Sequence, residues 1–416
     1  MINYQKFQLS NGLRVIVSEE ADNPLAVFNL LYDVGARDEN PDRTGFAHLF
    51  EHLMFSGSEN AESYDEEVHN AGGNANAFTS SDLTNFYITL PANNIETAFW
   101  LESDRMLAVT INEESLQREK GVVVEEFKEH YLNQPYGDAY QKLLSLSYNV
   151  HPYQWQVIGK EPAHIENATL EEVQQFFTTH YRPNRAILSV VGGVKAEEVM
   201  VLAEKWFGDI PSNYTYQRQL PTEPPQNTYK TDTVIADVPV NAIYMAFHCC
   251  SRLDPEYYAT EVIGEILSGG ASGRLYRRLV KDNPLFSSLN GFTYGHFDKD
   301  LFYVEGKLHQ NVSFEQALAA IWEQLELLKT ERISSEELQK CINKVESSIV
   351  FAEVNPQDKA FSLAYYELLG DIDSINTELT AYENVTDVAV QQTAQQLFRP
   401  ENCSVLCYQA KTPQEQ

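Results

Sequence analysis

An internal duplication is the feature that most restricts how this chain of 416 residues can fold. Residues 167–175 align with residues 384–392, and both segments begin with Asn-x-Thr and end with Gln-Gln. At the same distance downstream, Tyr-Arg-Pro at 181–183 aligns with Phe-Arg-Pro at 398–400, and an apolar stretch follows each of them. Self-similarity over such segments indicates a repeated structural unit. We therefore predict two homologous halves that share one fold.

Each half mixes apolar strands with amphipathic helices. In the first half, short apolar runs predict strands at residues 4–9, 13–18, 26–34 and 85–90. The helical spacing of apolar residues predicts helices at residues 45–55, 64–70, 95–108 and 115–131. This interleaving is typical of the α+β class, with helices packed on a mainly antiparallel sheet in each half.

The region between the halves, residues 211–232, is rich in Pro, Gln, Thr and Tyr, which favours an extended linker. We therefore expect a metal-bearing α+β domain at 1–212, a linker at 213–232, and a homologous α+β domain without metal at 233–416. A chain of this length is long enough for two large domains.

The segment His-Leu-Phe-Glu-His at 48–52 predicts a metal site. On a helix, residues three and four apart share one face, so His48, Glu51 and His52 point the same way. This is the inverted form of the zinc-protease motif. Two imidazoles and one further carboxylate leave a position for water on a tetrahedral zinc, and a nearby Glu can take the proton of that water. A helix with two ordinary histidines is the alternative interpretation.

An acidic helix downstream of this motif offers the further carboxylate. Glu119 and Glu126 are seven residues apart, so they lie on one face of that helix. Together, the two segments resemble the pitrilysin/insulinase family of zinc metallopeptidases, close to its short bacterial and mitochondrial-processing members. The resemblance implies that Glu126 is the third zinc ligand, Glu119 a supporting acid and Glu51 the general base. We expect Glu125 and Glu129 to belong to a solvated face.

Residues 71–87, between the two motifs, begin with a Gly pair and continue with the character of a strand. Similar segments in the family form an edge strand beside the zinc, where an extended peptide adds through main-chain hydrogen bonds. The resemblance implies that Asn76 and Ala77 contact the backbone of the substrate. The residues alone would favour an ordinary hairpin.

The second half does not repeat the metal ligands. The counterpart of the zinc helix, at 258–267, has no histidine, and Ser348 stands near the position of Glu126. Active family members also carry an Arg and a Tyr in the second half, where this chain has Val280 and Ser287. In two-subunit relatives that pair lies on a second, zinc-free chain. We therefore expect a heterodimer in which this chain is the zinc-bearing subunit, and the alternative is a protein that works alone or as a homodimer.

Charge and cysteine usage limit the partners and the compartment. A formal net charge of −30 would repel phosphate, which argues against nucleic acid as a partner. The first residues lack the apolar core of a signal peptide, and no run of about 18 apolar residues occurs, so we expect no membrane span. Five cysteines without Cys-x-x-Cys spacing are expected to be free thiols, which favours a cytoplasmic location.

The combined prediction is a zinc-dependent endopeptidase that hydrolyses peptides or unfolded segments. The alternative is a non-catalytic core subunit of a larger assembly, although such subunits typically lose the metal ligands that this chain keeps. A zinc hydrolase for a substrate other than a peptide is a third possibility, which suits an edge strand less well. Cobalt or manganese could replace zinc, because sites of His and carboxylate accept several divalent ions.

Overall fold

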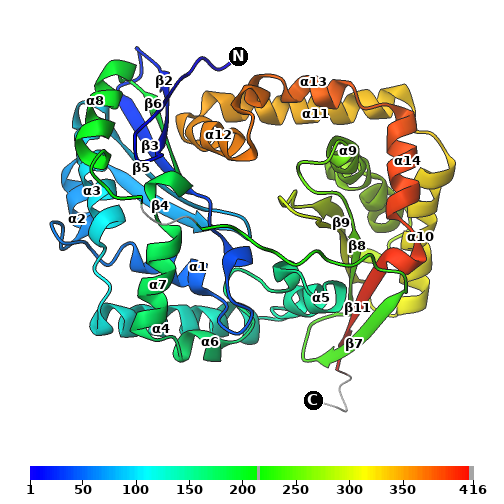
Figure 1. Ribbon diagram of the computed structural model, residues 1–416. Helices are drawn as coiled ribbons and strands as arrows, with labels where there is room; N and C mark the ends of the chain where they lie inside the picture. Colours follow the sequence, from blue (N-terminus) through cyan, green and yellow to red (C-terminus); the bar gives the residue numbers. More distant parts are fainter. Residues whose placement is uncertain (213–215, 412–416) are drawn as a thin grey trace. The chain divides into compact units, whose positions relative to one another are not determined.

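The computed structural model describes residues 1–212 and 216–411 (Figure 1). Residues 213–215 of the expected linker and residues 412–416 of the expected second domain lie outside this description. The chain forms two compact units, each built around one sheet. The first unit comprises Met1–Phe127, Trp155–Leu220 and Ile349–Thr377, and the second comprises Lys128–Gln154, Pro221–Ser348 and Glu378–Gln416.

The sheet of the first unit has six strands within the described residues, in the order β1-β2-β6-β3-β5-β4. Its strands are β1 (Gln5–Gln8), β2 (Arg14–Glu19), β3 (Leu25–Tyr32), β4 (Asn74–Thr79), β5 (Thr84–Pro91) and β6 (Ala186–Gly192). Strands β2 and β6 pair in parallel, and the other neighbours pair antiparallel. The central strands β3 and β6 are buried along almost their whole length, as expected for strands covered on both faces.

Helices cover both faces of this sheet (Figure 1). Those of the first unit are α1 (Phe46–Leu53), α2 (Tyr64–Asn70), α3 (Ile95–Ala108), α4 (Glu113–Phe127), α6 (Pro162–Glu166), α7 (Leu170–His180), α8 (Ala196–Phe207) and α12 (Pro356–Leu369). Phe28 of β3 packs on Phe99 of α3 and Phe207 of α8. On the opposite face, Ser189 of β6 donates a hydrogen bond to the carbonyl oxygen of Ala360 in α12.

The sheet of the second unit repeats this arrangement. Its described strands are β7 (Lys230–Ala236), β8 (Ala242–His248), β9 (Phe286–Thr293), β10 (Leu301–Leu308) and β11 (Cys403–Ala410). Their order, β7-β11-β8-β10-β9, matches β2-β6-β3-β5-β4, and β7 and β11 form a parallel pair at the same place. The predicted α+β fold, with two related halves and mainly antiparallel sheets, is therefore confirmed.

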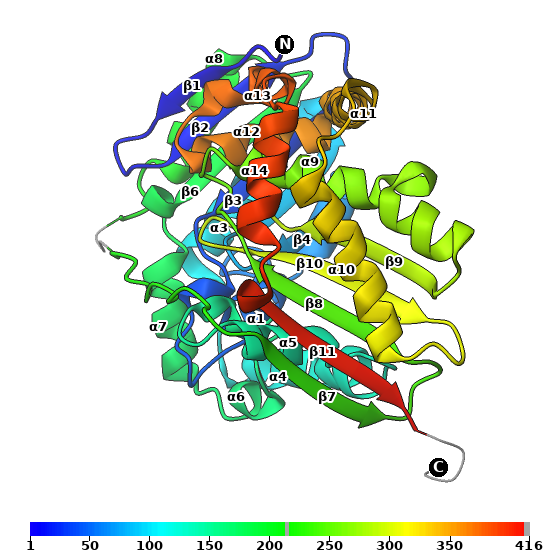
Figure 2. The same ribbon diagram turned by 90° about the vertical axis from the view of Figure 1, so that its right-hand side faces the viewer.

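The helices of the second unit also lie on both faces of its sheet. They are α5 (Ala139–Ser147), α9 (Tyr257–Ser268), α10 (Phe314–Thr330), α13 (Glu378–Glu383), α14 (Asp387–Leu397) and most of α11 (Ser335–Val354). Phe247 of β8 packs on Trp322 of α10, on the face that α10 and α14 cover (Figure 2). On the other face, Tyr244 of β8 packs on Tyr140 of α5.

The compact units differ from the contiguous domains 1–212 and 233–416 that the duplication suggested. Helix α5 follows α4, and α12 follows α11, so the two helices hold equivalent positions in the repeat. Nevertheless α5 packs on β8 and β11 of the second unit, whereas α12 packs on β3 and β6 of the first unit. Strand β7 also begins at Lys230, inside the expected linker 213–232, because its backbone pairs with β11.

The predicted helices at 64–70 and 95–108 agree with α2 and α3. The helix expected at 115–131 is α-helical only to Phe127 and continues as a π-helical turn over Lys128–Leu132. Among the helices of the described residues, none combines the length and the apolar character that crossing a membrane would require.

Candidate metal centre

Helix α1 carries the His-x-x-Glu-His segment, and a buried carboxyl group holds its first turn. The side chain of Glu39 accepts hydrogen bonds from the backbone N–H groups of Gly45 and Ala47, both at 2.9 Å. It also accepts one from Nε1 of Trp155 at 3.0 Å. Burial raises the pKa of Glu39 to about 8, and these three N–H donors act in the opposite direction. Glu39 thus supplies the partners that the first N–H groups of a helix need.

The turn that leads into α1 requires a glycine. Gly45 has a φ of +90°, which side-chain-bearing residues rarely adopt, and a Cβ atom there would lie 2.7 Å from the carbonyl oxygen of Ile158. The start of α1 is therefore fixed both by backbone conformation and by the Glu39 hydrogen bonds.

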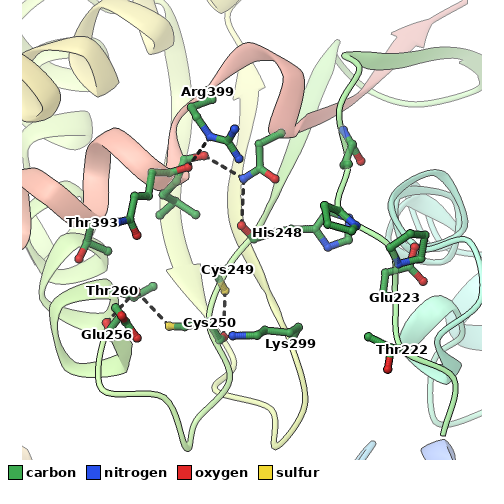
Figure 3. A pocket seen from close by; sticks show the side chains of 16 residues that line it. Thr222, Glu223, His248, Cys249, Cys250, Glu256, Thr260, Lys299, Thr393 and Arg399 are labelled. Atoms are coloured by element: carbon green, nitrogen blue, oxygen red, sulfur yellow. Dashed lines mark hydrogen bonds between the residues drawn. The ribbon is translucent and has the colours of Figure 1, made fainter.

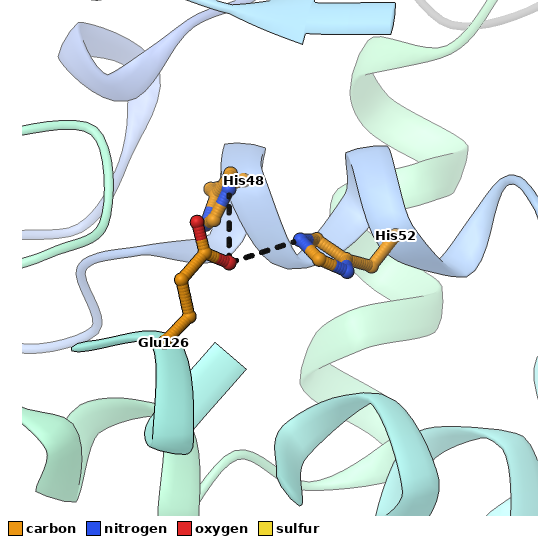
Figure 4. Close-up of side chains that lie close together, drawn as sticks. All are labelled: His48, His52 and Glu126. Atoms are coloured by element: carbon orange, nitrogen blue, oxygen red, sulfur yellow. Dashed lines mark ion pairs between the residues drawn. The ribbon is translucent and has the colours of Figure 1, made fainter. Parts of the chain in front are cut away.

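Three predicted ligands come together between α1 and α4. Nε2 of His48 lies 3.8 Å, and Nε2 of His52 lies 3.4 Å, from the same oxygen of Glu126, as Figure 4 shows. One ligand atom from each residue lies within 4.8 Å of the other two. Metal–ligand bonds of about 2.0–2.1 Å in a tetrahedron place ligand atoms about 3.3–3.4 Å apart. The spacing therefore fits one ion after small side-chain adjustments.

The protonation of His48 also fits a metal ligand. Burial, together with the neighbouring His52, lowers the pKa of His48 to about 4, so its imidazole is neutral at pH 7. A metal binds the neutral imidazole, because a protonated nitrogen has no lone pair to offer. The donor set of two imidazoles and one carboxylate is one that zinc commonly uses.

Glu51 lies beside this group without belonging to it. Its Oε2 accepts a hydrogen bond of 2.6 Å from Oγ1 of Thr79, the last residue of β4. Burial raises the pKa of Glu51, while the hydrogen bonds from Thr79 and the nearby His52 lower it. A carboxylate in this setting is a better proton acceptor than an exposed one.

Glu119 lies behind His52 on the same face of α4 as Glu126. One of its oxygens is 3.8 Å from Nδ1 of His52, and the other accepts a hydrogen bond of 2.8 Å from Nε of Arg118. Glu119 is thus near the ring nitrogen that a supporting acid would contact, although 3.8 Å exceeds a hydrogen bond. Glu125 is exposed, as expected.

Strand β4 forms the edge of its sheet, because only β5 pairs with it in the described part of the chain. The side chain of Asn76 accepts a hydrogen bond of 2.8 Å from the N–H of Ala77, so this N–H points away from β5. Two residues further along, the N–H of Thr79 is directed to Glu51. The free edge of β4 therefore ends at Glu51. The hairpin that the residues alone favoured is also present, formed by β4 and β5.

Sequence reasoning missed Glu39 and Thr79. Glu39 precedes α1 by seven residues and lies outside the window of local capping patterns. Thr79 was only weakly indicated by its position: it lies two residues after Ala77, so in a strand the two side chains point to the same face.

Neither Val280 nor Ser287 offers the charge or the phenol expected at these positions. Val280 lies in a π-helical segment, Tyr276–Asp282. Ser287 is exposed on β9, and its hydroxyl donates a hydrogen bond to the carbonyl oxygen of Lys307.

Two imidazoles one helical turn apart face a carboxylate from a second helix of a duplicated α+β fold, which is the arrangement that the inverted zinc-protease motif predicts. Residues 14–159 match the family model described as insulinase (peptidase family M16), and residues 167–345 match the one described as the peptidase M16 inactive domain. The chain belongs to the M16 peptidase family. The expected resemblance to the insulinase family is therefore confirmed.

Similar proteins include several named zinc proteases. The zinc protease PqqE of Helicobacter pylori is 29% identical over 381 residues, which are 89% of this chain and 85% of that protein. A probable mitochondrial-processing peptidase subunit beta of Arabidopsis thaliana is 26% identical over 82% of this chain and 66% of its own length. The crystal structure of a protease from Helicobacter pylori superimposes with a TM-score of 0.92 at 25% identity, covering 98% of this chain and 100% of that one.

Proposed function

We propose that this chain is a zinc-dependent endopeptidase that hydrolyses peptides or unfolded segments. One observation carries the proposal: the ligand atoms of His48, His52 and Glu126 lie within 4.8 Å of one another, with Glu51 beside them. The names of the similar proteins support zinc as the metal.

His48, His52 and Glu126 would hold the metal. Bound there, zinc would lower the pKa of a water molecule and polarise the scissile carbonyl group. The carboxylate of Glu51 takes one proton from the attacking water and later delivers it to the nitrogen of the leaving amine. Thr79 orients Glu51 through its hydroxyl.

The free edge of β4 gives an extended substrate a place to bind. A peptide that added to this edge beside Asn76 and Ala77 would pair its backbone with main-chain groups that β5 does not pair, and it would displace the side chain of Asn76 from the N–H of Ala77. Because that edge ends at Glu51, the scissile bond of such a peptide would lie next to the proton acceptor. Because this pairing would use main-chain groups of the substrate, it supports recognition of unfolded segments of many sequences.

We further propose that the active form is a heterodimer with a related, zinc-free chain. The residues Val280 and Ser287 support this arrangement, because they lack the functional groups that active relatives use there. Some similar proteins are themselves named as subunits of a mitochondrial-processing peptidase. A cytoplasmic location stays a prediction, and the five free thiols are consistent with it.

The test is metal content and peptide hydrolysis of the purified chain, alone and with a candidate partner. We expect about one zinc per chain, and Glu51→Gln should keep the metal while turnover falls about 10²- to 10⁴-fold. Glu126→Gln should lose the metal, whereas the neighbouring exposed Glu125→Gln should behave like the wild type.

Each contrary result has a distinct meaning. A chain that binds no metal would favour the core-subunit alternative, and an active Glu51→Gln variant would remove Glu51 from the mechanism. Robust hydrolysis by the chain alone would refute the heterodimer and leave the zinc peptidase intact.

A further inference from the structure

Two adjacent cysteines form a partly buried thiol pair in the second unit. Cys249 and Cys250 directly follow β8, and both are less buried than the other cysteines. The other three cysteines of the chain, Cys341, Cys403 and Cys407, are buried. A thiol reagent of low molecular weight would therefore meet this pair first.

Both sulfur atoms have hydrogen-bonding partners nearby. The strand ends before Cys249, and Sγ of Cys249 donates a hydrogen bond of 3.5 Å to the carbonyl oxygen of Cys250. Sγ of Cys250 also lies 3.3 Å from Oγ1 of Thr260, as Figure 3 shows. Sγ of Cys249 lies 3.8 Å from Oγ1 of Thr293.

The two thiols differ in acidity. The neighbouring side chain of Cys249, together with Thr260 and Lys299, lowers the pKa of Cys250. Burial raises the pKa of Cys249 well above its ordinary value. Because the thiolate is the nucleophile, Cys250 is the more reactive member of the pair.

Both thiols line a cavity of about 500 Å³, which is within the size range of small-molecule sites. Its wall carries charged side chains of both signs, from Lys299 and Arg399 and from Glu223 and Glu256 (Figure 3). Lys299 pairs with Asp254, Arg399 pairs with Glu401, and Glu223 accepts hydrogen bonds from the backbone N–H groups of residues 149–151. A wall with groups of both signs suits a small, peptide-like molecule, and the size of the cavity therefore points to a peptide-like thiol as its occupant.

We propose that Cys250 is a site of reversible S-thiolation by a peptide-like disulfide of low molecular weight, whose attached half occupies this cavity. The thiolate sulfur of Cys250 attacks one sulfur of the disulfide. A new S–S bond to Cys250 forms while the original S–S bond breaks, and the leaving thiolate takes a proton from water. The thiol of Cys250 is oxidised and the added disulfide is reduced, so no other reactant is needed.

The adduct should persist, because Cys249 is poorly placed to displace it. Neighbouring Cα atoms are about 3.8 Å apart across a trans peptide bond, whereas disulfides usually span Cα distances of about 4.4–6.8 Å. A Cys249–Cys250 disulfide would therefore be strained and easily reduced. Cys249 instead serves to acidify its neighbour.

The experiment treats the intact, metal-loaded chain with oxidised glutathione and measures its mass. We expect one glutathione per chain, released by a reducing agent, and peptide mapping should place it on Cys250. The adduct should be absent in Cys250→Ser, slower to form in Cys249→Ser, and unchanged in the buried control Cys341→Ser.

Three results would overturn the proposal: no adduct on the wild-type chain, an adduct mapped to another cysteine, or oxidation to a Cys249–Cys250 disulfide without an adduct. Mapping of the wild-type adduct keeps the test decisive if Cys250→Ser does not fold. The result is independent of peptidase activity.

Discussion

Replacement of Glu39 should weaken metal binding although Glu39 is not a ligand. At about pH 9, above the pKa of Glu39, the wild-type side chain is a carboxylate. In Glu39→Gln, the amide oxygen can still accept from Gly45 and Trp155, but the amide nitrogen then faces the N–H of Ala47. One buried N–H loses its acceptor, which costs about 1–3 kcal/mol. In Glu39→Ala, the N–H groups of Gly45 and Ala47 lose their acceptor, while Nε1 of Trp155 keeps the carbonyl oxygen of Ala36, and we expect a loss of about 4 kcal/mol.

The first turn of α1 should then fray next to His48. Loss of a group that supports metal ligands typically lowers metal affinity about 10- to 100-fold, and we expect this range for Glu39→Gln. The assay combines chemical unfolding of the metal-free protein with competition for zinc against a chelator, at a temperature where the variant is folded.

A matched control variant separates a loss of zinc affinity caused by misplaced ligands from one caused by general destabilisation of the protein. Asp300 is a fully buried carboxylate of the second unit, and it accepts hydrogen bonds from the N–H groups of Gly295 and His296. Asp300→Asn should lower the free energy of unfolding by a similar amount without changing zinc affinity. If Glu39→Gln lost stability yet bound zinc like the wild type, the inference that Glu39 positions the ligand helix would be wrong.

Four further variants test other features of the chain. Thr79→Val removes the 2.6 Å hydrogen bond to Glu51, and turnover should fall about tenfold with metal content unchanged; equal kcat values would contradict the orienting role. Burial lowers the pKa of His180 to about 4, so between about pH 4 and 6.5 the unfolded chain binds a proton that the folded chain lacks. The stability of the wild type relative to His180→Gln should therefore rise by up to about 3 kcal/mol from pH 4 to 6.5, and a flat difference in urea unfolding would exclude this. Gly45→Ala should lower the free energy of unfolding by at least about 2 kcal/mol, because Gly45 has a positive φ and a Cβ atom there would lie 2.7 Å from the carbonyl oxygen of Ile158. Gly121→Ala, in open space on α4, should raise it by about 1 kcal/mol, and thermal unfolding compares the two variants.

Local spacing explains which parts of the centre could be predicted. His48, Glu51 and His52 share one helix, so their common face follows from helical geometry alone. Glu126 required the resemblance, because spacing within α4 does not say which acid faces another helix. Glu39 was not predictable, since its hydrogen bonds to α1 depend on how the intervening loop folds back.

In the fold, too, some features follow from the sequence repeat, whereas others depend on contacts between residues far apart in the sequence. Strand order follows from the repeat, since β7 to β11 retain the arrangement of their counterparts in the first half. The alignment of the halves gives the position of α5 and α12 in the repeat but not the sheet on which each packs. That choice depends on contacts between residues far apart in the sequence, such as the hydrogen bond from Ser189 to the carbonyl oxygen of Ala360.

The exchange of α5 and α12 has a consequence for synthesis on the ribosome. The sheet of the first unit is complete once β6 has emerged, yet the helix that covers one of its faces is encoded about 165 residues later. Until residues 356–369 leave the exit tunnel, that face of β3 and β6 has no native cover. We therefore expect the nascent first half to bind chaperones, and a stop codon just before residue 356 should damage both units, because α12 and β11 are then both lost.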